Sequence, residues 1–576
     1  MAILGQLLLM KTNFFLPFLL LISTVADAQW SGNTTPTYPE LIAYYQKLDR
    51  EHSEIELYAM GKSDTDWPIY LCIINGAQDS LKTFEKAKTS TTVLINNAIH
   101  PGEPDGVNAC LIWIDNWIKN GKKTANLPVI AIIPAYNVGG MFNRSSNSRA
   151  NQDGPEEYGF RGNSQNLDLN RDFIKMDSPN AFTFVTLYQA LDPDVFVDTH
   201  VSNGADYQYT LTYISSMKER MAPSMRTLTY DKCIPSLTSR LKKRKTDLFP
   251  YVELQEDIPD KGIIAFNDLP RYAMGYASLF HALSFTVETH MLKPFPERVE
   301  ATLQFLEELI VWSKECAPDI ELARKKAIDW SLEQPVFHYN YKRTEKADSV
   351  LFKGYKAIYK TSPVTGLERL FYDRNQPFTK KVPHFQTHRS IDSVVIPKAY
   401  FIGGSNTEVI ARLKANGVQL STVLHDSLVL VTTNKVLKYE SGKQPYEGHF
   451  LHSGTVVEKE QNQILIPAGT VMISTRQPKS YFIVSVLEPA AEDSYFAWNF
   501  FDSYLQQKEY FSAYVFEEKA AEILANDLKL AEEFNAKKLS DPAFAINSWD
   551  QLFFIYKRSI YYEKTTANRL PIWEVR

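Results

Sequence analysis

The chain has 576 residues, which is too long for one ordinary domain, so we expect two or three. Its composition, 44% hydrophobic and 22% charged, is that of a globular protein, and its formal net charge is −5. The sequence has no basic stripe or arginine-rich segment, which argues against a nucleic-acid-binding protein.

The N-terminus has the pattern of a signal peptide. A short apolar run at residues 14–22 follows Lys11, and an Ala-x-Ala pattern comes at residues 26–28. The run is too short to span a bilayer, and no second long apolar run follows it. We therefore expect residues 1–28 to be removed and the mature chain to be exported, periplasmic or extracellular, without a transmembrane segment. The four scattered cysteines show no metal-type spacing; an oxidising compartment would permit one disulfide, whose pairing the sequence does not define.

Strands alternate with helices between residues 29 and 330, which is the pattern of an α/β domain. Buried strands are predicted at residues 69–74, 93–95, 129–133, 195–197 and 285–287. Helices are predicted over residues 107–118, from Ser178-Pro179 onward, and over residues 295–312. Residues 141–167 are polar and predict a long loop of the kind that usually carries function.

The chain changes character after residue 330. Residues 330–349 are polar and predict a linker. Strand-like runs at residues 394–401, 428–432 and 481–486, with a short helix at 407–416, predict a β-rich accessory region over 331–488. Residues 511–538 are rich in good helix formers, so a mainly helical region is expected over 489–576. The histidine pairs 384/388 and 449/452 lie in polar surroundings and are expected in solvated loops, so we predict no catalytic cluster in this half.

Polar residues with metal-binding side chains follow the predicted strands. His100 and Glu103 come after the strand at 93–95, and Pro101-Gly102 between them indicates a tight turn. An imidazole and a carboxylate on such a turn can close on one metal ion, and a catalytic zinc takes three protein ligands. His200 follows the strand at 195–197 and is the candidate for the third, because the carboxyl ends of strands are where open α/β sheets bind ligands. Glu288 ends a further strand, so we expect one shared site.

These residues together resemble the carboxypeptidase A-like zinc metallopeptidases. The resemblance lies in a His-x-x-Glu motif at 100–103, then Asn170-Arg171, then a strand-end His200 and a strand-end Glu288, in that order. It covers residues 38–312, about half of the chain. It implies a mixed sheet with helices on both faces and one Zn²⁺ per chain, held by two histidines and a glutamate.

The resemblance also implies roles for the individual residues. His100, Glu103 and His200 match the zinc ligands, and Glu288 matches the glutamate that takes a proton from the attacking water and then gives it to the leaving amine. Asp168 matches the acid that holds the first zinc histidine in the right tautomer.

Substrate contacts follow from the same comparison. Asn170 and Arg171 match the pair that binds the free α-carboxylate of a peptide, a task for which a guanidinium is suited because it can grip a carboxylate bidentately. The family's substrate-capping tyrosine would fall at residues 263–266, where this chain has no tyrosine, so Tyr272 or Tyr276 is expected to replace it.

Three points stay open. The family has an arginine that stabilises the oxyanion, for which Arg144, Arg149 and Arg161 compete here, and Arg149 is preferred. Many relatives have a serine after the third ligand, but Val201 follows it here, so the preferred terminal side chain is not predicted. Arg271 is either a specificity residue or a surface arginine on a loop.

The predicted function is an exported zinc metallocarboxypeptidase that acts on peptides with a free C-terminus. A first alternative is an amidase or cell-wall peptidase on the same fold, although retention of Asn170-Arg171 favours a substrate with a free carboxylate. A second alternative is a binding protein whose peptidase domain is inactive. The presence of all the catalytic residue types argues against that second alternative.

Overall fold

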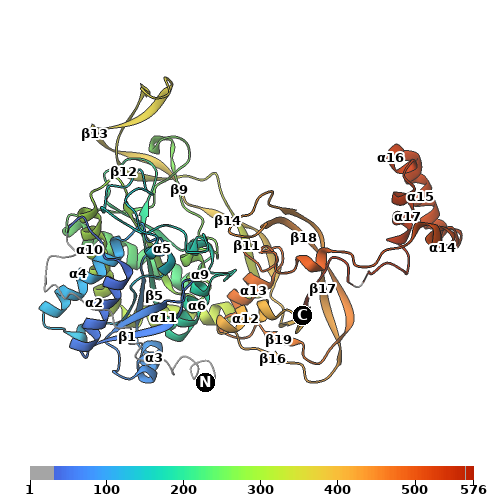
Figure 1. The fold of residues 1–576 in the computed structure, drawn as a ribbon, viewed down its shortest axis with the longest axis horizontal. Helices are drawn as coiled ribbons and strands as arrows, with labels where there is room; N and C mark the ends of the chain where they lie inside the picture. Colours follow the sequence, from blue (N-terminus) through green and yellow to red (C-terminus); the bar gives the residue numbers. More distant parts are fainter. Residues whose placement is uncertain (1–31, 565) are drawn as a thin grey trace.

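The computed structural model describes residues 32–564 and 566–576, so the predicted signal peptide lies outside the described residues. The first half of the chain forms an eight-stranded sheet in the order β1-β2-β4-β3-β5-β10-β6-β7 (Figure 1). Its strands are β1 (Ile55–Lys62), β2 (Pro68–Ile74), β3 (Thr92–Asn96), β4 (Val129–Ile133), β5 (Val195–Ser202), β6 (Leu211–Ser215), β7 (Leu248–Pro250) and β10 (Leu283–His290). The neighbours β4, β3, β5 and β10 are parallel, and so are β6 and β7. The pairs β1–β2, β2–β4 and β10–β6 are antiparallel, which confirms the mixed sheet.

The parallel centre of the sheet follows directly from its sequence. β3, β4 and β5 are buried at every residue, as expected for apolar, β-branched strands covered on both faces. β5 and β10 are longer than predicted, because both continue through polar residues that the fold buries. His200 and Glu288 therefore lie inside strands, directly opposite each other in the parallel register.

Helices cover both faces of this sheet. Phe196 of β5 packs against Phe184, and Phe285 of β10 packs against Phe305. Because Phe196 is in register with Ser284, Phe285 must point to the opposite face. The helices on the Phe305 side are α4 (Asp105–Lys119), α8 (Ile234–Lys243) and α10 (Phe295–Glu315), and those on the Phe184 side include α6 (Pro179–Leu191) and α9 (Ala273–Ser278).

Two predicted helix features are confirmed. Ser178 caps α6 by accepting a hydrogen bond from the backbone N–H of Ala181, and Pro179 occupies the first turn. α10 is tied to the start of α4 by the fully buried Arg298, whose Nε lies 2.8 Å from Asp105 Oδ1. Within the described part of this half, the other α-helices are α2 (Tyr38–Glu51), α3 (Ser80–Thr89), α5 (Val138–Phe142), α7 (Pro223–Arg226) and α11 (Ala317–Glu333).

Two predictions for the second half are wrong. Residues 330–349 are no linker, because α11 runs through Trp330 and β11 (Val336–Arg343) then pairs with β14 (His388–Val395). Residues 481–486 are no strand but lie in the wholly buried helix α13 (Ser480–Leu487). A short continuous apolar run fits a buried helix as well as a buried strand, so periodicity could not separate them.

The six-stranded sheet of the accessory region includes a strand from beyond residue 488, where the predicted helical region begins. The six-stranded sheet has the order β16-β19-β15-β20-β17-β18, and β20 (Arg569–Val575) lies between β15 and β17. Its other strands are β15 (Ala399–Ile402), β16 (Ser421–Thr422), β17 (Ser427–Ser441), β18 (His452–Ile466) and β19 (Val471–Ser474). The final strand of the chain therefore completes the accessory sheet.

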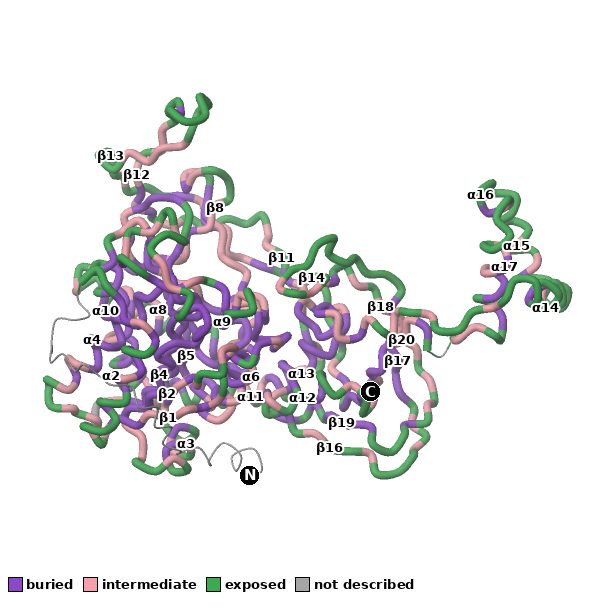
Figure 2. The backbone as a smooth tube through the Cα atoms, viewed as in Figure 1, coloured by how far each residue is buried: buried purple, intermediate pink, exposed green. Residues whose placement is uncertain are grey.

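The predicted helical segment is confirmed as a group that projects from the body and has a mostly exposed surface (Figures 1 and 2). Phe516, Leu552 and Ile555 belong to its own small apolar cluster. Its helices are α14 (Ala513–Asn526), α15 (Leu528–Ser540), α16 (Pro542–Ala545) and α17 (Ser548–Tyr556).

A long hairpin also projects from the body (Figure 1). It consists of β12 (Asp348–Thr361) and β13 (Glu368–Phe385), and it joins β8 (Glu253–Leu254) and β9 (Ile263–Ile264) in a four-stranded sheet.

One apolar core runs from the eight-stranded sheet into the accessory region, where it includes residues of α12 (Thr407–Ala415) and α13. The two halves are therefore packed together rather than strung on a linker. The expectation of solvated histidines fails as well: His384, His388 and His452 are buried. All four cysteines are free thiols. Among the residues that the structure describes, no helix combines the length and apolar character that a membrane span requires.

Candidate metal centre

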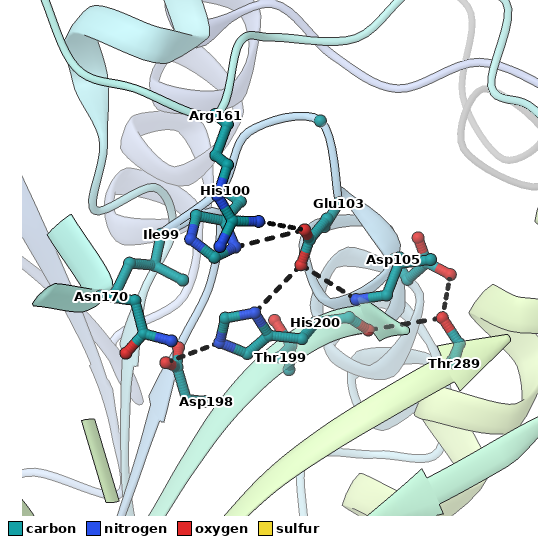
Figure 3. A network of polar contacts seen from close by, with 12 residues as sticks. Ile99, His100, Glu103, Asp105, Arg161, Asn170, Asp198, Thr199, His200 and Thr289 are labelled. Carbon is teal, nitrogen blue, oxygen red and sulfur yellow. Dashed lines mark hydrogen bonds and ion pairs between the residues drawn. The ribbon is translucent and has the colours of Figure 1, made fainter. Parts of the chain in front are cut away.

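His100, Glu103 and His200 come together at the carboxyl edge of the sheet, and all three are buried (Figure 3). One ligand atom from each lies within 4.8 Å of the others. His200 Nδ1 is 3.0 Å from Glu103 Oε2, and His100 Nδ1 is 3.2 Å from Glu103 Oε1. The turn that the sequence predicted is closed by a hydrogen bond from Glu103 N–H to His100 O, 2.8 Å long.

These residues fit a zinc ion. His100 Nδ1 is buried and has no hydrogen-bond partner among the described residues, although it faces the carboxylate of Glu103. A buried polar atom without a partner is costly, and a metal ion would satisfy it. Two imidazoles and one carboxylate are the donor set of a catalytic zinc site with one open position.

A carboxylate lies behind each imidazole. His100 Nε2 is 2.9 Å from Asp168 Oδ1, and His200 Nε2 is 2.9 Å from Asp198 Oδ2. Both rings therefore turn Nδ1 toward the centre, and the aspartates hold the rings in that orientation. Asp168 was predicted, but Asp198 was not. The position of Asp198, two residues before His200 in β5, was a signal that the two side chains lie together, because residues i and i+2 of a strand share a face.

The centre is strongly charged. Burial opposes ionisation of Glu103, but Arg149 and His100 hold its pKa well below the usual range. Burial likewise opposes protonation of His200, but Asp198 and Glu103 raise its pKa well above the usual range. A metal must displace the proton from His200, so zinc affinity is expected to increase with pH.

Glu288 lies beside this centre without belonging to the three-residue cluster. It is partly exposed and directly opposite His200 in the register of β10 and β5. Removal from water raises the pKa of Glu288 to about 7; the charge of His200 opposes this rise and the nearby Glu103 adds to it. A carboxylate with a pKa near neutrality suits general acid–base work.

The structure brings two of the three candidate arginines to the centre. Arg149 Nη2 is 2.6 Å from Glu103 Oε1, so its charge is already paired with a candidate ligand. Arg161 Nη1 is 3.5 Å from the same oxygen, and Arg161 Nε is 3.0 Å from Asp168 Oδ2. Burial opposes the charge of Arg161, but Asp168, Glu103 and Glu288 raise the pKa of its guanidinium. Arg144 instead binds Glu157 and the backbone near residue 35. Arg161 is thus the arginine whose charge acts on Glu288.

Asn170 and Arg171 lie on a short 3-10 helix, η2 (Leu169–Arg171), next to Asp168. Asn170 Oδ1 accepts a hydrogen bond from the N–H of Ala273, 3.1 Å long, which ties this helix to α9. The Arg171 guanidinium lies 4.5 Å from the centre of the Tyr272 ring. Arg171 and Tyr272 are partly exposed, so both can meet a ligand.

Tyr276 and Arg271 are placed differently from the predictions. Tyr276 is fully buried, and its hydroxyl donates to Asn416 Oδ1 at 2.8 Å, because the side of α9 that carries it packs into the core. The structure therefore does not bring Tyr276 to the centre. Arg271 is not a surface arginine: it is buried, its Nε is 2.7 Å from Asp493 Oδ1, and it lies over the Trp498 ring.

Comparison with known proteins agrees with this geometry. The sequence profile described as "Zinc carboxypeptidase" matches residues 41–247, the region that holds all three candidate ligands. This part of the chain is a zinc carboxypeptidase domain. Carboxypeptidase 2 of Trichophyton tonsurans is 22% identical over 502 residues, which cover 82% of this chain and 85% of that protein. Carboxypeptidase 2 of Trichophyton equinum matches to the same extent, 22% over 502 residues, with 82% and 85% coverage.

A solved metallo-carboxypeptidase from Burkholderia cenocepacia is 16% identical, with a TM-score of 0.36, and the match covers 48% of this chain and 70% of that one. The match over residues 41–247 and the two fungal relatives indicate a hydrolase of the zinc carboxypeptidase class.

One more aromatic residue near the metal centre was missed by the sequence analysis. Tyr251 packs edge-on against Phe266, which packs against Tyr272. Burial raises the pKa of Tyr251 well above the usual range, and Glu288 adds to this rise, which places the phenol near the catalytic candidate. No motif pointed to Tyr251, because it lies directly after β7 and reaches the centre by tertiary packing alone.

Proposed function

We propose that the chain is an exopeptidase that releases C-terminal residues from peptides with a free carboxylate, with one Zn²⁺ held by His100, Glu103 and His200. The observation that carries this proposal is the grouping of those three ligand candidates with Glu288 at one sheet edge. A zinc ion at this position would polarise the scissile carbonyl and lower the pKa of water.

The chain's own residues would then divide the work. Glu288 accepts a proton from the water that attacks the peptide carbonyl and passes it to the leaving amine, and its raised pKa allows both transfers. Arg161 lies close to Glu103 and Asp168, and we assign it, in place of Arg149, to the negative charge that develops on the carbonyl oxygen. Asp168 and Asp198 hold the two histidines in the ligand orientation.

Recognition of the free C-terminus of a peptide would depend on residues of η2. Arg171 presents a guanidinium stacked over Tyr272, and Asn170 stands beside it, so both can hydrogen-bond a terminal carboxylate. This pair favours a peptide with a free C-terminus over the amide or cell-wall substrates of the first alternative.

We also propose that the chain is exported. The support comes from the sequence: the apolar run at residues 14–22 behind Lys11, and the Ala-x-Ala pattern at 26–28. N-terminal sequencing of the mature protein should begin near Gln29. A mature protein that retains residues 1–28 would contradict export by this route.

The activity is tested with matched peptides. Purified protein is incubated with peptides that differ only in a free or an amidated C-terminus, and the products are identified by mass spectrometry. We expect stepwise loss of single C-terminal residues from the free peptides, abolished by a chelator and restored by zinc. Cleavage at internal bonds, or equal cleavage of the amidated peptides, would contradict the exopeptidase assignment.

A further inference from the structure

A turn of the accessory region reaches the zinc carboxypeptidase domain. We call residues 446–449 the accessory turn; it lies between β17 and β18. Tyr446 N–H donates to His449 O at 2.7 Å, and His449 N–H donates to Tyr446 O at 3.0 Å. The two residues between them, Glu447 and Gly448, have φ values of 52° and 82°. This is the geometry of a two-residue hairpin turn with both central residues in the left-handed region.

The accessory turn holds the substrate-binding segment of the catalytic domain at both ends. Glu447 Oε2 accepts a hydrogen bond from the N–H of Asp168, 2.8 Å long. His449 Nε2 lies 2.8 Å from Asp177 Oδ2. The segment between these two anchors carries Asn170 and Arg171, so the turn is bonded on both sides of the residues assigned to the terminal carboxylate.

The turn is fixed rather than loosely apposed. The Tyr446 ring stacks on Trp498, with 6.2 Å between ring centres, and Arg271 lies over both rings. Arg271 is in turn paired with Asp493. The anchors around Tyr446 and His449 therefore fix the position of Glu447 relative to η2.

Glutamate is an unexpected residue at this position. Asn, Asp and Gly are favoured at the first central position of such a turn, and a bulkier residue there is strained. Residues held in strained conformations cluster at functional sites. The hydrogen bond to Asp168 needs only a neutral acceptor, so that bond does not explain why Glu447 carries a charge.

The charges around Glu447 indicate what it could bind. Burial and the neighbouring Asp168 raise the pKa of its carboxyl, while Lys175 and Arg171 act in the opposite direction. Lys175 is already bonded to Asp172 at 2.8 Å and to Asp177. Arg171 Nη1 lies 3.8 Å from Asp168 Oδ2, so Arg171 is the cation that acts on both Asp168 and Glu447 when the site is empty.

A bound substrate changes this balance. Once a terminal carboxylate takes the guanidinium of Arg171, Glu447 and Asp168 share less of its charge, and Lys175 stays paired with Asp172 and Asp177. A positive group on the same terminal residue would restore the balance, and a partly buried ion pair of this kind gives specificity. A neutral side chain would leave Glu447 unpaired, and an acidic one would be repelled.

We propose that Glu447 is a specificity-determining residue, supplied by the accessory region, that favours substrates ending in lysine or arginine. This inference rests on the proposed exopeptidase function and on Arg171 as the carboxylate-binding residue. The accessory region then belongs to the substrate site, and its turn sets which terminal side chain is accepted.

The test uses the full chain loaded with zinc and four peptides that are identical except for a terminal Lys, Arg, Leu or Glu. Glu447→Gln keeps an oxygen that can accept from Asp168 N–H but removes the charge. We expect kcat/KM to fall at least tenfold for the Lys and Arg peptides and to change less than about twofold for the Leu peptide. The Glu peptide should be cleaved faster by the variant than by the wild type.

Two further variants sharpen the result. Glu447→Lys should invert the preference, so that the Glu peptide becomes better than the Lys peptide. Glu458→Gln, whose carboxylate binds Lys435 on the same sheet at 2.7 Å, removes the same charge and should leave the peptide ranking unchanged. Thermal unfolding of each variant shows whether a loss reflects folding.

The outcomes separate the two proposals. If Glu447→Gln lowers all four rates equally, Glu447 only holds Asp168 in place and the specificity proposal is overturned. The same holds if the ranking of the peptides is unaltered in both Glu447 variants. If the wild-type enzyme releases no terminal residue from any peptide, the exopeptidase function itself fails, and this inference fails with it.

Discussion

Glu288→Gln is the change that most directly tests the proposed chemistry. The substitution keeps the size of the side chain, but an amide cannot accept the proton of the attacking water. Glu288 is opposite His200 but outside the three-residue cluster, so zinc content should stay at one ion per chain. Positioned acid–base catalysis contributes about a hundred- to ten-thousand-fold.

The structure points to the middle of that range. The zinc ligands and Arg161 remain in the variant, so part of the polarisation of the carbonyl survives. We expect kcat to fall about a thousandfold, which corresponds to about 4 kcal/mol of transition-state stabilisation. Steady-state kinetics on a free-carboxylate peptide and metal analysis of the same sample measure the two quantities. Near-normal turnover with full zinc would refute the general-base role, and loss of zinc would show that Glu288 is itself a ligand.

Other expectations follow from neighbouring groups. The pKa of Glu288 is raised to about 7 in the metal-free protein, and a bound cation would lower this pKa. The pH profile of kcat/KM should therefore rise with pH, with its midpoint between the ordinary carboxyl range and about 7. If the same rise persists in Glu288→Gln, it belongs to another group. His200→Ala should remove zinc and activity together, whereas a fully metallated variant would exclude His200 as a ligand. Arg171→Ala should weaken binding of free-carboxylate peptides by ~2–4 kcal/mol, and an equal loss on amidated peptides would make Arg171 structural. Arg298→Met leaves Asp105 buried without its cation and should lower the free energy of unfolding by ~3–5 kcal/mol, measured by denaturant titration. A double variant with Asp105→Asn should recover part of this loss. Full stability of the single variant would show that the pair contributes little.

Some functional residues were predictable because their signals are local. His100 and Glu103 lie on one turn that follows an apolar strand, and each of these features occupies only a few neighbouring residues. The strand at β4 and the cap of α6 by Ser178 were predicted for the same reason. Even Asp198 had a local signal, since a strand places residues i and i+2 on one face.

Other decisions belong to the tertiary structure. The sequence analysis preferred Arg149 to Arg161, and only the folded loop shows that Arg149 pairs with Glu103 while Arg161 acts on Glu288. Tyr276 is excluded from the centre by the rotation of α9 against the core. Glu447 reaches Asp168 across 279 residues of sequence.

The sequence by itself determined the ligand types, the central strands and the expected family, because these depend on residue identity and short-range periodicity. The tertiary structure decided which arginine acts on Glu288, which tyrosine stays in the core, and that a turn of the accessory region contacts Asp168. These outcomes depend on the packing of distant segments, for which local patterns carry no information. The apolar run at 481–486 fits a buried strand or a buried helix equally well, and its packing against neighbouring elements decides that it forms α13.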